Sequence, residues 1–174
     1  MKLLSLDLST SNSGWAVFQD GKLVEYGSIE EPKYKGKSLE RYPQRTGKVG
    51  KMMAEEVCQI MRDKKPDKII IEEASSNGIA GVKSIKSLIM LHGSLLTLML
   101  QSDFYQYDTL QFLSPREWRG AVGLKKQGDW KVSSVNLANK LFGLSLDLDC
   151  HDISDSILLG QGYLKLGGYL EKKV

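Results

Sequence analysis

The sequence is poor in cysteine and proline and has no long apolar run. Its 174 residues include four prolines and two cysteines, Cys58 and Cys150. Two cysteines cannot build a disulfide framework or a structural zinc site, so we expect a reducing compartment. The opening MKLLSLD is too short for a signal peptide, and no stretch offers the roughly 20 apolar residues that a membrane span needs. These absences predict a cytoplasmic protein.

The sequence also lacks a strong excess of either charge. Lys and Arg number 24 against 21 Asp and Glu, which gives a net charge of +3. This balance permits a nucleic-acid partner without requiring one. The content of 41% hydrophobic and 26% charged residues excludes a disordered chain, collagen and a coiled coil. Because no repeat, low-complexity tract or linker interrupts the chain, we predict one domain over residues 1–174.

The first half of the chain contains the patterns of several strands and one helix. Apolar residues alternate through 2–8 with the period of a strand, and two further strand-like runs flank Asp20-Gly21, a dipeptide typical of a tight hairpin. Helical spacing begins near Pro43 and stops at Lys64-Lys65-Pro66-Asp67. The consecutive isoleucines 69–71 indicate a strand buried on both faces, as in a partly parallel sheet.

The second half alternates helical and extended patterns. Residues 82–100 form a strongly apolar helix whose apolar arc is too wide for one contact face, and residues 104–109 predict a further strand. A polar, basic connection follows at 114–128, and helices are expected at 129–142 and 151–165. Three strands in a meander followed by this alternation predict an α/β fold: a mixed sheet with helices on both faces.

Four acidic residues stand where they could hold a metal. Asp7 and Glu72 each end an apolar strand, at the sheet edge where ligands bind in open α/β folds. Asp152 and Asp155 are neighbours three residues apart on a predicted helix, with Cβ atoms roughly 5–6 Å apart. Taken singly, a strand-end acid is usually a solvated terminus, and paired acids are usually surface charge in a first helical turn. Together, the four supply the oxygen ligands that Mg²⁺ prefers.

Basic residues cluster in two segments, 32–51 and 114–131, and side chains of this kind can neutralise phosphates. The candidate DNA contacts are Lys33, Lys35, Lys37 and Arg41 in the first segment and Arg116, Arg119, Lys125 and Lys126 in the second. Trp118 and Trp130 interleave with the second set, and either stack on unpaired bases or pack into the core. Lys131, on a predicted helix near the four acids, is a candidate to position a phosphate under attack.

Four short motifs, in order along the chain, resemble the RuvC family of Holliday-junction resolvases within the ribonuclease-H-like superfamily. They are L-D-L-S-T-S-N-S-G-W-A-V, P-D-K-I-I-I-E-E, G-A-V-G followed by W-K-V-S-S-V, and D-I-S-D-S-I-L-L. The resemblance runs from Met1 to about Leu166. It matches the family's acids, its glycine and its catalytic lysine to Asp7, Gly14, Glu72, Lys131, Asp152 and Asp155.

The resemblance implies a ribonuclease-H-like fold and a crossover junction endodeoxyribonuclease of DNA recombination and repair. Such an enzyme cuts four-way and other branched DNA with two Mg²⁺ ions, which Mn²⁺ can replace, held by the four acids. It acts as a two-fold homodimer, for which the helix at 82–100 is our candidate interface. A branch-migration partner is not indicated. The family's occurrence in bacteriophages suggests a phage-encoded member that acts in the host cytoplasm.

The chain departs from the family at two positions, and two other functions remain open. Ser9 replaces a glycine two residues after the first acid, and Ser75 replaces an aromatic residue. The opening D-L-S-T-S-N-S-G-W-A also resembles the phosphate loop of actin-like ATPases and sugar kinases, although these need two such lobes and 174 residues hold one. A non-catalytic branched-DNA-binding protein is the third possibility, although it would not need all four acids.

Overall fold

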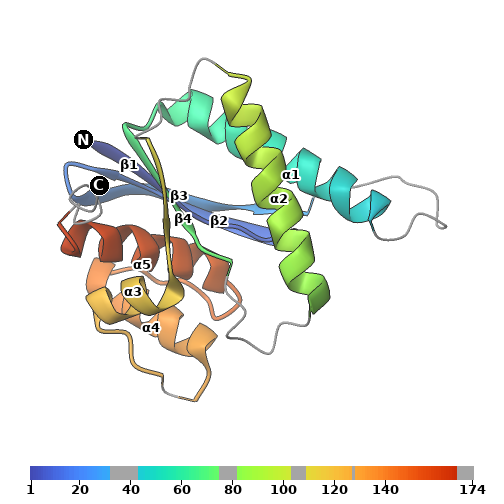
Figure 1. Cartoon of the computed structure of the whole chain (residues 1–174). Helices are drawn as coiled ribbons and strands as arrows, with labels where there is room; N and C mark the ends of the chain where they lie inside the picture. Colours follow the sequence, from blue (N-terminus) through green and yellow to red (C-terminus); the bar gives the residue numbers. More distant parts are fainter. Residues whose placement is uncertain (32–42, 75–81, 103–108, 127, 168–174) are drawn as a thin grey trace.

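A computed structural model describes residues 1–31, 43–74, 82–102, 109–126 and 128–167, and Figure 1 shows its helices and strands. The strands are β1 (Lys2–Asp7), β2 (Asn12–Gln19), β3 (Lys22–Glu30), β4 (Lys68–Glu72) and β5 (Leu110–Leu113). The helices are α1 (Gln44–Lys64), α2 (Val82–Leu100), α3 (Pro115–Val122), α4 (Trp130–Phe142) and α5 (His151–Lys165).

The described strands form a mixed sheet with the order β3-β2-β1-β4-β5. β2 pairs antiparallel with both β1 and β3, whereas β4 pairs parallel with β1 and β5. The hairpin turn has φ of 51° at Asp20 and 81° at Gly21, the left-handed backbone that a tight hairpin requires. The predicted meander and parallel strand are therefore confirmed. The strand predicted at 104–109 falls almost entirely on residues outside the description, and β5 begins at Leu110.

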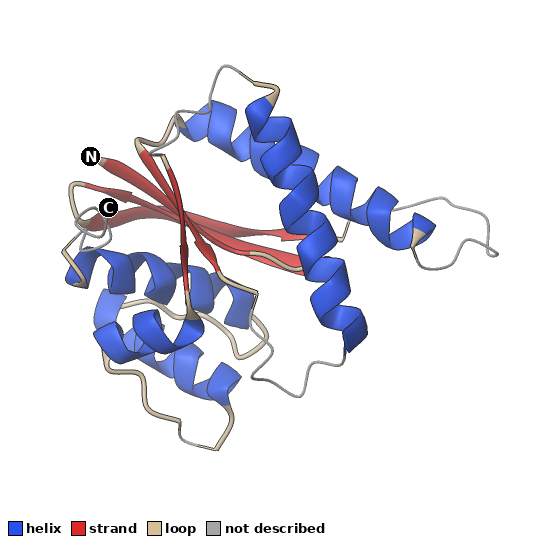
Figure 2. Cartoon of the chain, viewed as in Figure 1, coloured by secondary structure: helices blue, strands red, loops and turns tan. Residues whose placement is uncertain are grey.

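Helices cover both faces of the sheet, as Figures 1 and 2 show, with α1 and α2 on one face and α3, α4 and α5 on the other. Side chains alternate along β1, so Leu4 and Leu6 pack in the core beneath α1 and α2, and Leu3 packs in the core on the side of α5. The predicted fold class is confirmed. The same alternation turns the side chain of Asp7 toward α5, together with that of Leu3.

The connection predicted at 114–128 is wrong in its first half, because residues 115–122 form helix α3. Ser114 caps this helix: its hydroxyl accepts a hydrogen bond from the Glu117 backbone N–H at 3.3 Å, and the Glu117 carboxylate accepts one from the Ser114 N–H at 3.0 Å. Proline occupies the first turn, where its missing N–H costs nothing. Trp118 and Val122 of α3 are buried in the core against α5.

Helix α5 is buried on more than one side, because it lies between the sheet and helices α3 and α4. Its buried side chains include Ile157, Leu158, Leu159 and Tyr163. A β-carbon on Gly160 would lie 2.6 Å from the Ser5 hydroxyl of β1, so only glycine allows this close approach. The Ser5 hydroxyl donates a 2.7 Å hydrogen bond to the Ser156 carbonyl. Helix α5 is therefore fixed against β1.

Helix α2 presents apolar side chains in more than one direction. Leu91, Leu95 and Met99 are buried against the core, whereas Ile89 and Leu100 are 57% and 67% exposed. The wide apolar arc predicted from the sequence is present in the structure. None of the described helices combines the length and the apolar character needed to cross a membrane.

Candidate active site

Asp7 and Glu72 lie next to each other at the carboxyl end of two parallel strands. Leu6 of β1 pairs with Ile71 of β4, so the residue after each stands at the same edge of the sheet. Burial raises the pKa of Asp7 well above its ordinary value, and the charge of Glu72 raises it further. The two strand ends that the sequence singled out therefore place two carboxyl groups within electrostatic reach of each other.

The first turn of helix α5 adds two more carboxyl groups to this edge, because a glycine in β2 lets the helix come close to the sheet. A β-carbon on Gly14 of β2 would lie 1.9 Å from the backbone carbonyl oxygen of Asp152. Gly14 is also the β2 partner of Asp7 in the β1–β2 ladder. The glycine therefore brings Asp152 close to Asp7, and Asp155 follows three residues later on the same helix.

The four carboxyl groups repel one another. After burial, the charges of Glu72, Asp155 and Asp152, in that order, raise the pKa of Asp7. Burial and then the charge of Asp155 raise the pKa of Glu72 to about 7, and the pKa of Asp155 is also raised, chiefly by burial. Each of the four keeps part of its surface in solvent. A site with this much unbalanced negative charge favours the binding of cations.

Hydrogen bonds from neighbouring side chains orient three of the acids. Trp118 of α3 donates its indole N–H to Glu72 Oε2 at 2.7 Å, and Ser134 of α4 donates its hydroxyl to Asp155 Oδ1. Asn12, at the start of β2, donates its side-chain N–H to Asp152 Oδ2 at 2.6 Å. For Trp118, the structure supports packing into the core, whereas Trp130 is 36% exposed. Sequence reasoning missed Asn12 and Ser134, because their donor role depends on contacts between distant elements.

The polar turn after β1 holds Asn12 in place. The Ser9 hydroxyl accepts hydrogen bonds from the backbone N–H groups of Ser11 and Asn12 at 3.2 and 3.0 Å. The Ser13 hydroxyl donates to the Ser9 carbonyl at 2.9 Å. Ser9, the residue that departs from the family pattern, therefore stabilises this turn through its side chain.

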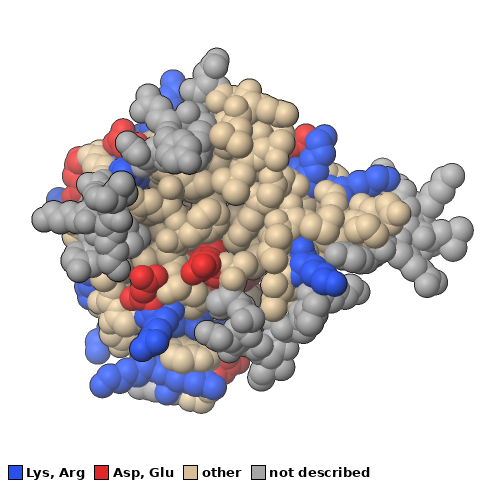
Figure 3. All heavy atoms as spheres, in the orientation of Figure 1, with Lys and Arg blue, Asp and Glu red and all other residues tan. Residues whose placement is uncertain are grey.

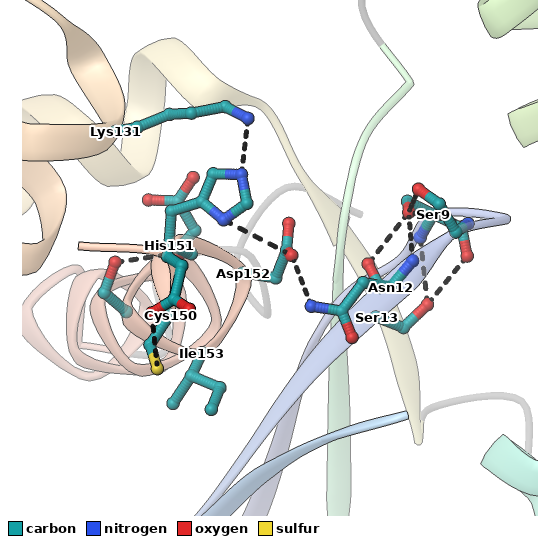
Figure 4. A network of polar contacts seen from close by, with 12 residues as sticks. Ser9, Asn12, Ser13, Lys131, Cys150, His151, Asp152 and Ile153 are labelled. Carbon is teal, nitrogen blue, oxygen red and sulfur yellow. Dashed lines mark hydrogen bonds and ion pairs between the residues drawn. The ribbon is translucent and has the colours of Figure 1, made fainter. Parts of the chain in front are cut away.

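Lys131 reaches the acidic edge through an intervening ring. Its ammonium contacts Nε2 of His151, and Nδ1 of the same ring lies 3.4 Å from Asp152 Oδ2 (Figure 4). The structure thus places Lys131 one side chain away from Asp152, and its role toward a phosphate stays a prediction. His151 begins α5 and its side chain is 22% exposed, so it is neither a helix cap nor a freely exposed residue.

The predicted DNA-contact residues fall into three groups: exposed residues, Arg119, and residues outside the described part of the chain. Arg116, Lys125 and Lys126 are exposed. Arg119 lies between two indoles, with its guanidinium carbon 5.0 Å from the ring centres of Trp118 and Trp130, and its charge lowers the pKa values of Asp7, Glu72 and Asp155. In Figure 3, Lys and Arg side chains over α3 and α4 lie beside the acidic atoms near the end of β4. Lys33, Lys35, Lys37 and Arg41 lie outside the described residues, as does Ser75.

The donor set fits a hard divalent cation. Asp7, Glu72, Asp152 and Asp155 offer only carboxylate oxygens, the ligands that Mg²⁺ and Mn²⁺ accept. In the described ranges, no group of three or more Asp, Glu, His or Cys side chains has its ligand atoms gathered around one point. The carboxyl groups therefore match such an ion in chemistry and in electrostatics, without a preformed coordination shell.

We expect the metal-free protein to become more stable as the pH falls from about 8 to about 5. The pKa of Glu72 is raised from 4.5 to about 7, so in this range the folded state binds a proton that the unfolded state does not. The stabilisation is complete below about 4.5 and is lost as the pH rises through about 7. Calorimetry in a chelator measures it as the change of Tm with pH.

The Glu72→Gln variant tests whether Glu72 causes this dependence of stability on pH. At pH 8 its Tm should exceed that of the wild type by roughly 2–8 °C, because ~1–2 kcal/mol of charge burial and repulsion is relieved, and its Tm should vary less with pH. The neighbouring Glu73 is exposed, and Glu73→Gln is the matched control that should behave as the wild type. A wild-type Tm that is constant between pH 5 and 8 would contradict the prediction.

Comparisons with known proteins identify similar structures but no similar sequence. No family model matches the chain, and no curated protein does. The structure is similar to Thermus thermophilus RuvC in complex with a Holliday junction substrate, with a TM-score of 0.66 and 12% identity over 97% of this chain and 96% of that one. It is also similar to the yeast mitochondrial Holliday junction resolvase Ydc2, with a TM-score of 0.63 and 16% identity over 98% of this chain and 80% of that one.

A third similar structure comes from a virus. The fowlpox virus resolvase, solved with Holliday junction DNA, has a TM-score of 0.55 and 16% identity over 95% of this chain and 97% of that one. At such low identity these similarities concern the fold. They confirm the predicted resemblance at that level: the chain has the ribonuclease-H-like fold of RuvC-type resolvases.

Proposed function

We propose that this chain, with the fold of RuvC-type resolvases, is a metal-dependent endonuclease that cuts four-way and other branched DNA. The observation that carries the proposal is the meeting of four carboxyl groups, from β1, β4 and α5, at one end of the sheet. Two of the similar proteins were solved with Holliday junction DNA, and their folds match nearly the whole chain. A bacteriophage origin and a cytoplasmic location stay predictions from the sequence.

In this proposal Asp7, Glu72, Asp152 and Asp155 hold two Mg²⁺ ions, for which Mn²⁺ can substitute. Bound there, the ions supply the chemistry of two-metal phosphodiester hydrolysis, which leaves 5′-phosphate and 3′-hydroxyl ends. The protein's part is to orient the ligands. Hydrogen bonds from Trp118 and Asn12 restrict the carboxylates of Glu72 and Asp152 before any ion binds.

The cations next to the acids bind and orient the DNA backbone. The Lys131 ammonium, on the first turn of α4, stabilises the negative charge that develops on the phosphate under attack. Arg119 lies against two indoles, and its charge already acts on Asp7, Glu72 and Asp155, so its guanidinium is placed to pair with a phosphate bound at these acids. The exposed Arg116, Lys125 and Lys126 bind the arms of the junction through their phosphates.

The proposed assembly is a two-fold homodimer that uses the exposed apolar side of α2. A four-way junction has two equivalent strands to cut, which suits two active sites related by a two-fold axis. Ile89 and Leu100 on α2 are more than half exposed, as expected for part of an interface between chains.

The test is metal-dependent cleavage of a synthetic four-way junction, with linear duplex as the control substrate and sedimentation to measure the mass of the protein. We expect paired nicks in the junction with Mg²⁺ or Mn²⁺, little cutting of the duplex and the mass of a dimer. Affinity measured in Ca²⁺ should fall steeply with salt because phosphate contacts dominate binding. Junction binding without cleavage would favour a non-catalytic protein, and nucleotide hydrolysis without DNA would favour the kinase-like alternative.

A further inference from the structure

A chain of polar contacts joins α4 to β2 across the start of α5 (Figure 4). The Lys131 ammonium contacts Nε2 of His151, and Nδ1 of His151 lies 3.4 Å from Asp152 Oδ2. Asn12 donates to the same Oδ2 atom at 2.6 Å. The ring of His151 is therefore the link between Lys131 and the carboxylate cluster.

Hydrogen-bond chemistry fixes the state of this ring. An ammonium group has only protons to offer, so Nε2 of His151 must accept from Lys131 and must carry no proton. The remaining ring proton then lies on Nδ1, which faces Asp152 Oδ2. With this tautomer Nε2 accepts from the lysine, while Nδ1 faces the carboxylate at 3.4 Å and forms no hydrogen bond with it or with any other described residue.

Lys131 depends on this contact more than Asp152 does. Asp152 is already held by Asn12 and by the close packing of its backbone on Gly14. The side chain of Lys131 is exposed and has four rotatable bonds. In the described part of the chain, His151 is the one polar partner of its ammonium group.

We propose that His151 is a positioning residue that directs the ammonium group of Lys131 toward the catalytic carboxylates. The inference rests on the proposed nuclease function and adds a residue to its machinery. His151 forms no bond with the substrate in this proposal. It acts by reducing the number of directions in which Lys131 can point.

Single-turnover cleavage of the four-way junction tests the role of the ring. We expect His151→Ala to lower the rate about 10–100-fold, the usual effect of removing a group that orients catalytic residues. His151→Gln keeps an acceptor near the position of Nε2 and should restore most of the rate. His151→Asn, a variant matched in chemistry, keeps a polar group only near Nδ1 and should not. Rescue by Asn rather than Gln, or a wild-type rate for His151→Ala, would overturn the proposal.

A double-mutant cycle tests whether His151 acts through Lys131. In a Lys131→Ala background, His151→Ala should change the rate by less than about three-fold, because the group that it orients is gone. An equal loss in both backgrounds means that His151 acts elsewhere and contradicts the inference. Melting temperatures of all variants, measured without metal, separate these effects from loss of the fold.

Long-range proton–nitrogen NMR of the metal-free protein, in mildly alkaline buffer, reads the tautomer directly. We expect His151 as the Nδ1–H form, and Lys131→Met should abolish that preference. If the wild-type His151 ring carries its proton on Nε2, the contact from Lys131 to this ring is refuted. This measurement needs neither DNA nor metal, so the two proposals fail separately: a wild-type protein that cuts no DNA refutes the nuclease function, whereas the wrong tautomer refutes the role of His151.

Discussion

Replacing Glu72 with Gln, or Asp155 with Asn, is expected to lower the rate of junction cleavage by at least ~10³-fold. Each change keeps the size of the side chain and removes a negative charge from the carboxylate cluster. An amide is a poor ligand for Mg²⁺ compared with a carboxylate, and the loss of several kcal/mol of transition-state stabilisation corresponds to this factor. The measurement is the single-turnover rate on a four-way junction at saturating Mg²⁺.

The structure provides a control within one residue of the site. Glu73 follows Glu72 directly, but its side chain is exposed beyond the end of β4, so Glu73→Gln should cut as the wild type does. A second readout is the rise of Tm on addition of Mg²⁺, which should be clear in the wild type and much smaller in Glu72→Gln. Undiminished cleavage by both Glu72→Gln and Asp155→Asn would reject the assignment of these acids.

Replacing Gly14 with Ala is expected to destabilise the protein by about 3 kcal/mol or more and to abolish cleavage. The new methyl group would lie 1.9 Å from the Asp152 carbonyl oxygen and 2.8 Å from the Ile153 nitrogen. Both are backbone atoms, and β2 is hydrogen-bonded on both sides, so neither element can move without loss of other contacts. Calorimetry should show a fall in Tm of roughly 6–12 °C.

Gly93 is the matched control for this substitution. It lies in helix α2, is exposed, and a β-carbon there would have no neighbour within 4 Å. Gly93→Ala should therefore be neutral or raise stability by up to about 1 kcal/mol, because alanine favours the helix. If Gly14→Ala melts at the wild-type temperature, the close packing of α5 on β2 is refuted.

The sequence predicted the elements whose signals are local. The Asp20-Gly21 hairpin, the limits of α1 and the span of α2 follow from turn residues, caps and periodicity, and the structure has each of them. The acids Asp7 and Glu72 were recognisable because each ends an apolar strand. That their side chains face α5 follows from the two-residue period of a strand, once the position of α5 is known.

Features that depend on contacts between distant elements escaped the sequence. Helix α3 was not predicted because its segment is polar and basic and was assigned to a connection. The Ser114–Glu117 cap was recognisable in the sequence, since Ser-Pro-x-Glu is typical of the start of a helix. The sequence was equally compatible with Trp118 in the core and on the surface. The structure buries the side chain, with its indole N–H bonded to Glu72. The donor role of Asn12 joins residues 140 positions apart, for which a single sequence contains no signal.

The four clustered acids and the exposed basic residues of this protein lie on different secondary-structure elements. The carboxylates stand on β1, β4 and the enclosed helix α5, whereas Arg116, Lys125 and Lys126 stand on the outer surface around α3 and α4. Substitutions of these exposed basic residues can therefore accumulate during evolution without displacing the four carboxylates. For the proposed nuclease, this separation lets related proteins diversify in the DNA shapes that they contact while the four carboxylates stay in place.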